Sequence, residues 1–242
     1  MRSLADATPA WVWVPALATS GGTLSLEGDA AHHVARVCRA RAGEFVTLTD
    51  GLGGIARAEV LEGRSTLALR VAELRHEPPP IARVLLAGAP EGERGDWLVE
   101  KLVELGATAL TLVDTERDRW EGSARRIARW ERLMRAALQQ SRRAWLPAIN
   151  GPLPIAHAIE QLPEGSERWL AEPSGTLAGG IGIEAGREQI GAVGPSAGFT
   201  DSERDSLTER GFRAIRLSSG RLRSETAALA LLSWWAAAGS DS

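Results

Sequence analysis

The sequence predicts an α/β protein in which a mostly parallel sheet, covered by helices on both faces, follows a small β-barrel-like module. Short alternating runs of apolar and polar residues, typical of strands, dominate roughly the first 75 residues. Three consecutive prolines at 78–80 then form an extended connector. Beyond them, strand patterns alternate with helical patterns, which is the order expected of a parallel sheet. We therefore expect one domain over residues 1–76 and a second over residues 81–242.

The composition is that of a soluble globular protein with a sizeable core. Hydrophobic residues make up 44% and charged residues 24% of the 242 residues, and the formal net charge is -3. The single cysteine, Cys38, excludes an internal disulfide framework and a multi-cysteine metal site. Neither a signal peptide nor a transmembrane run is visible, so we expect a cytoplasmic protein with no membrane partner.

The first domain is predicted from several short strands and one short helix. Strands are expected over residues 11–14, 23–26, 45–49, 55–61 and 66–74, with a helix over 30–40. Within that helix, Val34, Val37 and Cys38 recur at helical spacing. The pair Asp50-Gly51 is a strong turn signal. A compact β-barrel is the natural way to close so many short strands.

The second domain is predicted from alternating strands and helices. Strands are expected over residues 82–87, 109–113, 168–171, 190–193 and 214–217, and helices are expected to begin near Asp96, Ser123, Thr200 and Ser224. Asp96 is expected to be an N-cap, and Thr200 with Glu203 forms a capping box. The last helix, 224–238, is apolar nearly all round, which predicts burial in a core or against a partner.

Ligands of open parallel sheets bind beyond the carboxyl ends of the strands. Those ends are residues 88–90, 114–119, 172–173, 194–199 and 218–223. The two glycine-bearing turns, 194–199 and 217–223, match neither the dinucleotide-binding glycine pattern nor a P-loop, so their backbones would surround a flat neutral ring such as adenine. Each turn, taken alone, is also explained as an ordinary connection between a strand and a helix.

Arginine carries nearly all the positive charge, since Lys101 is the only lysine. A GC-rich genome explains this bias, and so does recognition of phosphate by planar guanidinium groups. Arg221 and Arg223 precede a helix N-terminus, where positive charge is disfavoured. This position indicates that the two arginines face an anion.

Two further basic segments have two interpretations each. Arg125, Arg129, Arg132 and Arg135 form a stripe along the helix that begins near Ser123. The stripe is either a solvated face or a surface that follows phosphates. His32-His33, beside several arginines, point to different helix faces, which argues against a shared metal ion and leaves a small RNA-facing patch possible.

Five segments carry a more specific pattern. They are HHVARVCRARAGEFVTLTDG at 32–51, EKLVELGATALTLVDTERD at 100–118, RWERLMRAALQQSRR at 129–143, VGPSAGFTDSE at 193–203 and LSSGRLRSETAALALL at 217–232. In this order and spacing they resemble the RsmE-type ribosomal RNA uridine-N3 methyltransferases of the SPOUT superfamily, over nearly the whole chain.

The resemblance implies a fold, a cofactor and partners. It implies an N-terminal PUA-like β-barrel that helps to bind RNA and a C-terminal SPOUT domain whose end forms a trefoil knot. It further implies S-adenosylmethionine bound by the knot loops, a homodimer, and a uridine of small-subunit ribosomal RNA, or of the assembled small subunit, as the substrate. The alternative is a SPOUT-fold RNA-binding protein that has lost methyl-donor binding and catalysis.

The resemblance also implies roles for individual residues. Arg223 and Glu225 are the catalytic candidates. The candidates for cofactor binding are Leu170, Glu172, Gly194, Pro195, Gly198, Leu217, Ser218, Leu222 and Thr226. The candidates for RNA binding are Arg36, Arg39, Arg41, Arg129, Arg132 and Arg143. No metal ligand is expected.

The chain departs from the family pattern in both candidate loops. Ser196-Ala197 stands where the family usually has a glutamate and a glycine. In the last loop, Ser218 replaces a glycine, Gly220 an arginine and Arg221 an aliphatic residue. These departures motivate the binding-only alternative, whereas the retained Arg223, Glu225 and Thr226 favour an active enzyme.

Overall fold

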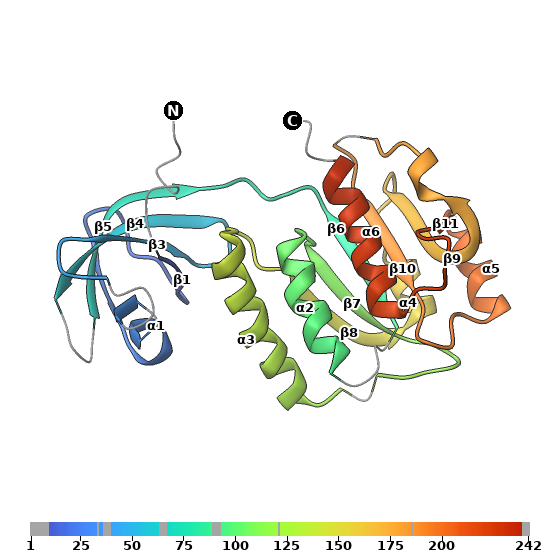
Figure 1. Cartoon of the computed structure of the whole chain (residues 1–242), viewed down its shortest axis with the longest axis horizontal. Coiled ribbons are helices and arrows are strands. Elements are labelled where there is room, and N and C mark those ends of the chain that lie inside the picture. The colour runs from blue at the N-terminus through green and yellow to red at the C-terminus, as the bar shows by residue number, and fades with distance from the viewer. Residues whose placement is uncertain are drawn as a thin grey trace. The chain divides into compact units, whose positions relative to one another are not determined.

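The computed structural model of the chain describes residues 10–32, 34–35, 40–62, 67–88, 93–120, 122–184 and 186–238 (Figure 1). The chain divides into two compact units, one within residues 1–79 and 135–146 and the other within 80–134 and 147–242. The segment 135–146 falls within the predicted second domain, but its contacts belong to the first unit.

The first unit is built on a five-stranded sheet in the order β1-β3-β4-β5-β2. Its elements are β1 (Trp11–Trp13), β2 (Thr23–Leu26), α1 (Gly28–His32), β3 (Phe45–Thr49), β4 (Gly54–Glu62) and β5 (Leu67–His76). The β1–β3 pair is parallel and the other pairs are antiparallel. Alternating residues such as Val46, Leu48 and Leu69 are completely buried, which confirms the strand pattern read from the sequence. Residues 33 and 36–39 of the expected helix 30–40 lie outside the described residues.

The second unit contains a six-stranded parallel sheet in the order β11-β9-β10-β6-β7-β8. Its strands are β6 (Arg83–Ala87), β7 (Ala109–Asp114), β8 (Ala148–Pro154), β9 (Glu167–Leu177), β10 (Gln189–Val193) and β11 (Arg213–Arg216). β8 was not predicted, because its residues AINGPLP resemble a turn. The segment forms a strand because it lies at the sheet edge, where proline's missing N–H is tolerated.

β9 was predicted to end at Ala171, but it continues to Leu177. Its pairing with β11 jumps from Leu170 opposite Ala214 to Thr176 opposite Ile215. Residues 171–175 are therefore an excursion from the strand, and its proline and polar residues explain why the continuation was not predicted. Gly175 returns the chain to the sheet, since a Cβ there would lie 2.5 Å from the Ala214 carbonyl carbon.

The helices and the short 3-10 helix η3 connect these strands. They are α2 (Arg94–Glu104), α3 (Ala124–Ser141), α4 (Ile155–Glu160), η3 (Ala178–Gly180), α5 (Asp201–Glu209) and α6 (Ser224–Ala238). The predicted capping box of Thr200 and Glu203 is confirmed. The prediction of Asp96 as an N-cap is wrong, because α2 begins two residues earlier. Asp96 instead accepts a 2.8 Å hydrogen bond from Trp130 Nε1 in α3. No helix among the described residues is both long and apolar enough to cross a membrane.

Side chains of β10 alternate between the two faces of the sheet. Ile190 and Ala192 pack in a cluster with Phe199 and residues of α4 and α5. On the other face, α6 packs against β6, β9 and β10 and beside α2, as Figure 1 shows. Gly191 permits this approach, since a Cβ there would overlap Leu231 of α6. One face of α6 is therefore buried in the core, as predicted, whereas Thr226, Ser233 and Ala237 are exposed.

Gly191→Ala should lower the free energy of unfolding by about 1–3 kcal/mol, because the added methyl group overpacks the contact between β10 and α6. Thermal denaturation measures the change as a melting temperature lowered by roughly 2–4 °C for each kcal/mol. Gly180→Ala is the control, because nothing lies within 4 Å of a Cβ at that position. Equal melting temperatures for the two variants would contradict this account of the packing.

Candidate active site

A cavity of about 810 Å³ opens at the carboxyl ends of the parallel strands. Its walls come from the excursion of β9, the loop after β10, the segment after β11 and the first turns of α2 and α6. The two glycine-bearing turns that the sequence analysis singled out are therefore parts of one site. Both were also explained as ordinary connections, and the shared cavity favours the binding-site interpretation.

The loop at 194–199 has a tight backbone that depends on two glycines. Gly198 has a φ of 72°, and its N–H donates a 2.8 Å hydrogen bond to the Pro195 carbonyl. A Cβ at Gly194 would lie 3.0 Å from the backbone nitrogen of Phe199. Ser196 and Ala197, which depart from the family pattern, are exposed, so side chains are accommodated there.

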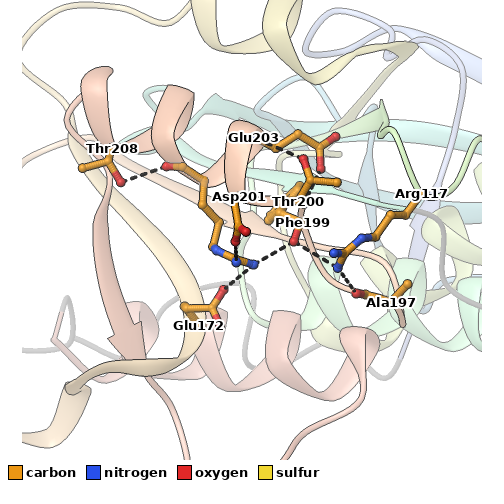
Figure 2. Close-up of polar contacts among 9 residues, drawn as sticks. Arg117, Glu172, Ala197, Phe199, Thr200, Asp201, Glu203 and Thr208 are labelled. Atoms are coloured by element: carbon orange, nitrogen blue, oxygen red, sulfur yellow. Dashed lines mark hydrogen bonds and ion pairs between the residues drawn. The ribbon is translucent and has the colours of Figure 1, made fainter.

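Two arginines hold this loop from different elements (Figure 2). Arg117, which follows β7, donates hydrogen bonds to the Ala197 carbonyl at 2.7 Å and to the Phe199 carbonyl at 3.2 Å. Arg204 of α5 donates to the same Phe199 carbonyl at 2.7 Å. Arg204 also pairs with Asp201 and lies 4.0 Å from a carboxylate oxygen of Glu172. The loop, α5 and the β9 excursion are thus connected through one guanidinium group.

Glu203 places the turn that carries Arg117. Its side chain is buried and accepts hydrogen bonds from the backbone N–H groups of Thr200 and Glu116, both at 2.8 Å. The first bond closes the capping box of α5 (Figure 2). The second fastens the turn after β7 to the same helix. One carboxylate therefore sets the distance between two walls of the cavity.

The segment after β11 forms the opposite wall. The Ser218 hydroxyl accepts a 3.2 Å hydrogen bond from the Gly220 N–H, which closes a local turn. Arg221 Nη2 donates a 3.3 Å hydrogen bond to the Ser196 carbonyl and so joins the two loops. A Cβ at Gly220 would meet nothing within 4 Å, so the packing in this chain does not require a glycine there.

Glu225, in the first turn of α6, is a buried carboxylate on the cavity wall. Its Oε1 lies 3.4 Å from Arg94 Nε, and its Oε2 accepts a 3.4 Å hydrogen bond from the Ser224 hydroxyl. Arg94 begins α2, which packs beside α6. Arg94 was not among the predicted site residues. Its position in the first turn of α2 could have indicated a nearby anion, because a cation at a helix N-terminus is disfavoured unless an anion faces it.

Most of the predicted site residues line the cavity. These are Glu172, Gly194, Pro195, Gly198, Leu217, Ser218, Leu222, Arg223 and Glu225. Leu170 does not line it, because its side chain is buried in the apolar cluster beneath α4 and α5. Thr226 is exposed and also lies outside the lining. Arg94, Arg117 and Arg204 line the cavity and were not predicted.

The structure separates the predicted RNA-binding arginines into different environments. Arg41 and Arg132 are exposed. Arg129 pairs with Asp96 at 2.7 Å, which partly neutralises the stripe on α3. Arg143 is half-buried, while Arg36 and Arg39 lie outside the described residues. Over the described ranges, no group of histidine, cysteine and acidic side chains is arranged to hold a metal ion.

Comparison with known proteins agrees with the motifs and the fold. Residues 77–236 match the RNA methyltransferase domain family, and residues 26–71 match the RNA methyltransferase PUA domain. The ribosomal RNA small subunit methyltransferase E of Mycobacterium bovis is 32% identical, over 95% of this chain and 94% of that protein. The chain belongs to this methyltransferase family. The protein of the same name from Synechocystis is 30% identical, over 85% of this chain and 70% of its own length.

Solved structures of similar proteins confirm the predicted fold class. A ribosomal RNA small subunit methyltransferase E from Neisseria gonorrhoeae, bound to S-adenosylmethionine, has a TM-score of 0.82 and 28% identity. That match covers 92% of this chain and 94% of the other. A protein from Legionella pneumophila, solved with S-adenosylmethionine, has a TM-score of 0.82 and 25% identity over 96% of this chain and 98% of its own. The family resemblance inferred from the sequence is confirmed.

Arg117→Ala should loosen the 194–199 loop, because two hydrogen bonds to its carbonyls are lost. Native-state hydrogen exchange of the Gly198 amide should become roughly three- to tenfold faster. This factor corresponds to the local stability lost when partly exposed, charge-assisted hydrogen bonds are removed. Arg119→Ala, an exposed arginine of the same turn, is the matched control. Equal exchange rates in the two variants would show that Arg117 does not hold the loop.

Proposed function

We propose that the protein transfers the methyl group of S-adenosylmethionine to N3 of a uridine in small-subunit ribosomal RNA. The observation that carries the proposal is the cavity itself. In a chain of this methyltransferase family, two glycine-bearing loops and a buried carboxylate converge on one cavity. Two proteins of TM-score 0.82 were solved with S-adenosylmethionine bound.

The cavity suits the methyl donor in size and in chemistry. Its volume of about 810 Å³ lies in the range of small-molecule sites. Backbone groups of the two loops surround it without a glycine-rich phosphate pattern, which suits an uncharged adenine ring. We assign donor binding to the lining residues Glu172, Gly194, Pro195, Gly198, Leu217, Ser218 and Leu222. Leu170 is assigned an indirect part, since it supports the wall from the core.

Bound S-adenosylmethionine supplies an electrophilic methyl group on a sulfonium. Uridine N3 carries an imide proton, which must leave for the nitrogen to become a nucleophile. We assign proton acceptance to Glu225, whose carboxylate is held between Arg94 and Ser224. We assign to Arg223 the stabilisation of the negative charge that develops on the uridine oxygens. Both residues line the same cavity.

The acceptor must reach this cavity as an unpaired base, turned out of its stack. The match of residues 26–71 to a PUA domain of RNA methyltransferases supports a role for the first unit in holding the RNA. The exposed Arg41 and Arg132 are the described candidates for contacts with its phosphates. A cytoplasmic homodimer with a knotted C-terminal domain is what the family resemblance implies, and we retain it as part of the proposal.

The proposal is tested with labelled S-adenosylmethionine and small ribosomal subunits from a strain without this modification. We expect label in the small-subunit RNA, together with donor binding measured by calorimetry. A methyl group on N3 blocks base pairing, so reverse transcription should stop next to one uridine. Absence of both label and donor binding would refute the proposal and leave an RNA-binding protein without catalysis.

Arg223→Ala should lower kcat by about a hundredfold, the usual effect of removing one group that stabilises developing charge. The dissociation constant of the donor should stay within about threefold, because the charge develops on the acceptor. Single-turnover rates and calorimetry measure the two quantities, with Arg187→Ala as a control outside the cavity. Equal losses in both would assign Arg223 to donor binding instead.

A further inference from the structure

The cavity carries more positive charge than its own carboxylates balance. Among the described residues, six arginines line it, at positions 94, 117, 204, 216, 221 and 223, against two glutamates, at positions 172 and 225. Three of the arginines interact with carboxylates or backbone carbonyl groups of the protein. Arg94 pairs with Glu225, Arg117 donates to two loop carbonyls, and Arg204 pairs with Asp201. These three build the walls of the cavity.

Arg216 and Arg221 differ from these three arginines because their charges have no acidic partner among the described residues. Arg216 ends β11, Arg221 lies in the turn that follows, and both are exposed. Within the part of the chain that the structure describes, neither forms an ion pair. Arg221 makes one hydrogen bond, to the Ser196 carbonyl, which orders its side chain over the loop and leaves its charge unbalanced. No acidic residue occurs between positions 210 and 224, so neither arginine has an acidic neighbour within its own segment.

The charge of the reactants decides what these two arginines can bind. The methyl donor carries a sulfonium, an ammonium and a single carboxylate, so its net charge is positive and its one carboxylate cannot balance two further cations. The uridine ring is neutral in its ground state. The anionic part of an RNA acceptor is its phosphodiester backbone, and exposed guanidinium groups bind phosphate oxygens through paired N–H donors.

We infer that Arg216 and Arg221 form a phosphate-binding subsite for the RNA backbone next to the target uridine. The inference rests on the proposed function. It extends that function to Arg216, which was not singled out from the sequence, and to Arg221, which was expected to face an anion. Contacts to phosphate position a nucleic acid without reading its sequence. At the rim of the cavity they would hold the strand while the base enters, and they would compensate part of the cost of unstacking it.

The test is the salt dependence of RNA binding. Arg216→Gln, Arg221→Gln and the double variant are titrated with a fluorescent, uridine-containing single-stranded oligoribonucleotide at several salt concentrations. Each lost phosphate contact should reduce the slope of log K against log salt by about 0.7, the value for single strands. Arg187→Gln, an arginine outside the cavity that pairs with Glu184, should keep the wild-type slope.

Three further measurements distinguish an RNA-backbone subsite from a donor contact and from a site for free phosphate. Arg221→Lys should keep the wild-type slope, because the charge remains. Arg216→Gln should leave donor affinity, measured by calorimetry, within about twofold, because the donor is not expected to contact this guanidinium group. Inorganic phosphate at constant ionic strength should not displace the oligonucleotide, because a single phosphate lacks the neighbouring contacts of the strand.

The inference is overturned by an unchanged slope in the double variant. It is also overturned by weakened donor binding in Arg216→Gln, or by displacement with inorganic phosphate, which would point to a free phosphate ligand. A failure of the proposed function would give a different set of results. Wild-type protein that shows the expected slopes but transfers no methyl group would leave the subsite standing and refute the catalytic proposal alone.

Discussion

The Phe199 carbonyl receives hydrogen bonds from two guanidinium groups, and the shape of the cavity depends on this convergence. Arg117 arrives from the end of β7 and Arg204 from α5, so one backbone oxygen joins two distant segments to the loop after β10. Charged donors make such bonds stronger than neutral ones and fix their direction. Glu203 completes the arrangement, because it ties the turn of Arg117 to the helix of Arg204.

This bracing explains which departures from the family pattern the loops tolerate. The loop after β10 keeps glycine at 194 and 198, where backbone contact or a positive φ requires it. Its unusual residues, Ser196 and Ala197, are exposed, and Arg117 holds the latter through its carbonyl rather than through its side chain. Gly220 in the last loop likewise has open space around it. The departures therefore change the chemistry of the rim more than the backbone that forms the cavity.

The arginines of the cavity divide into those that build the site and those that remain for a ligand. This division was invisible in composition, where an arginine-rich chain is equally explained by codon usage. The structure shows the difference as pairing. Arg94 faces a buried carboxylate, and Arg204 lies between Asp201 and Glu172. Arg216 and Arg221 form no ion pair within the described residues, and this unbalanced charge is the physical basis for assigning them to the acceptor rather than to the donor.

The sequence by itself determined most of the alternating strands and helices, the capping box at Thr200, the glycine turns and the family, but not β8 or α4. Each of these features depends on the spacing of nearby residues or on a short motif, so it can be predicted without knowledge of distant contacts. Only the tertiary structure decided that β9 leaves the sheet at 171–175 and that β8 is a strand at all. It also places Arg94 beside Glu225. It likewise places Arg117 within hydrogen-bonding distance of Ala197, 80 residues away in the sequence. Local periodicity carries no information over such separations, because those contacts are set by which strand ends the parallel sheet places side by side.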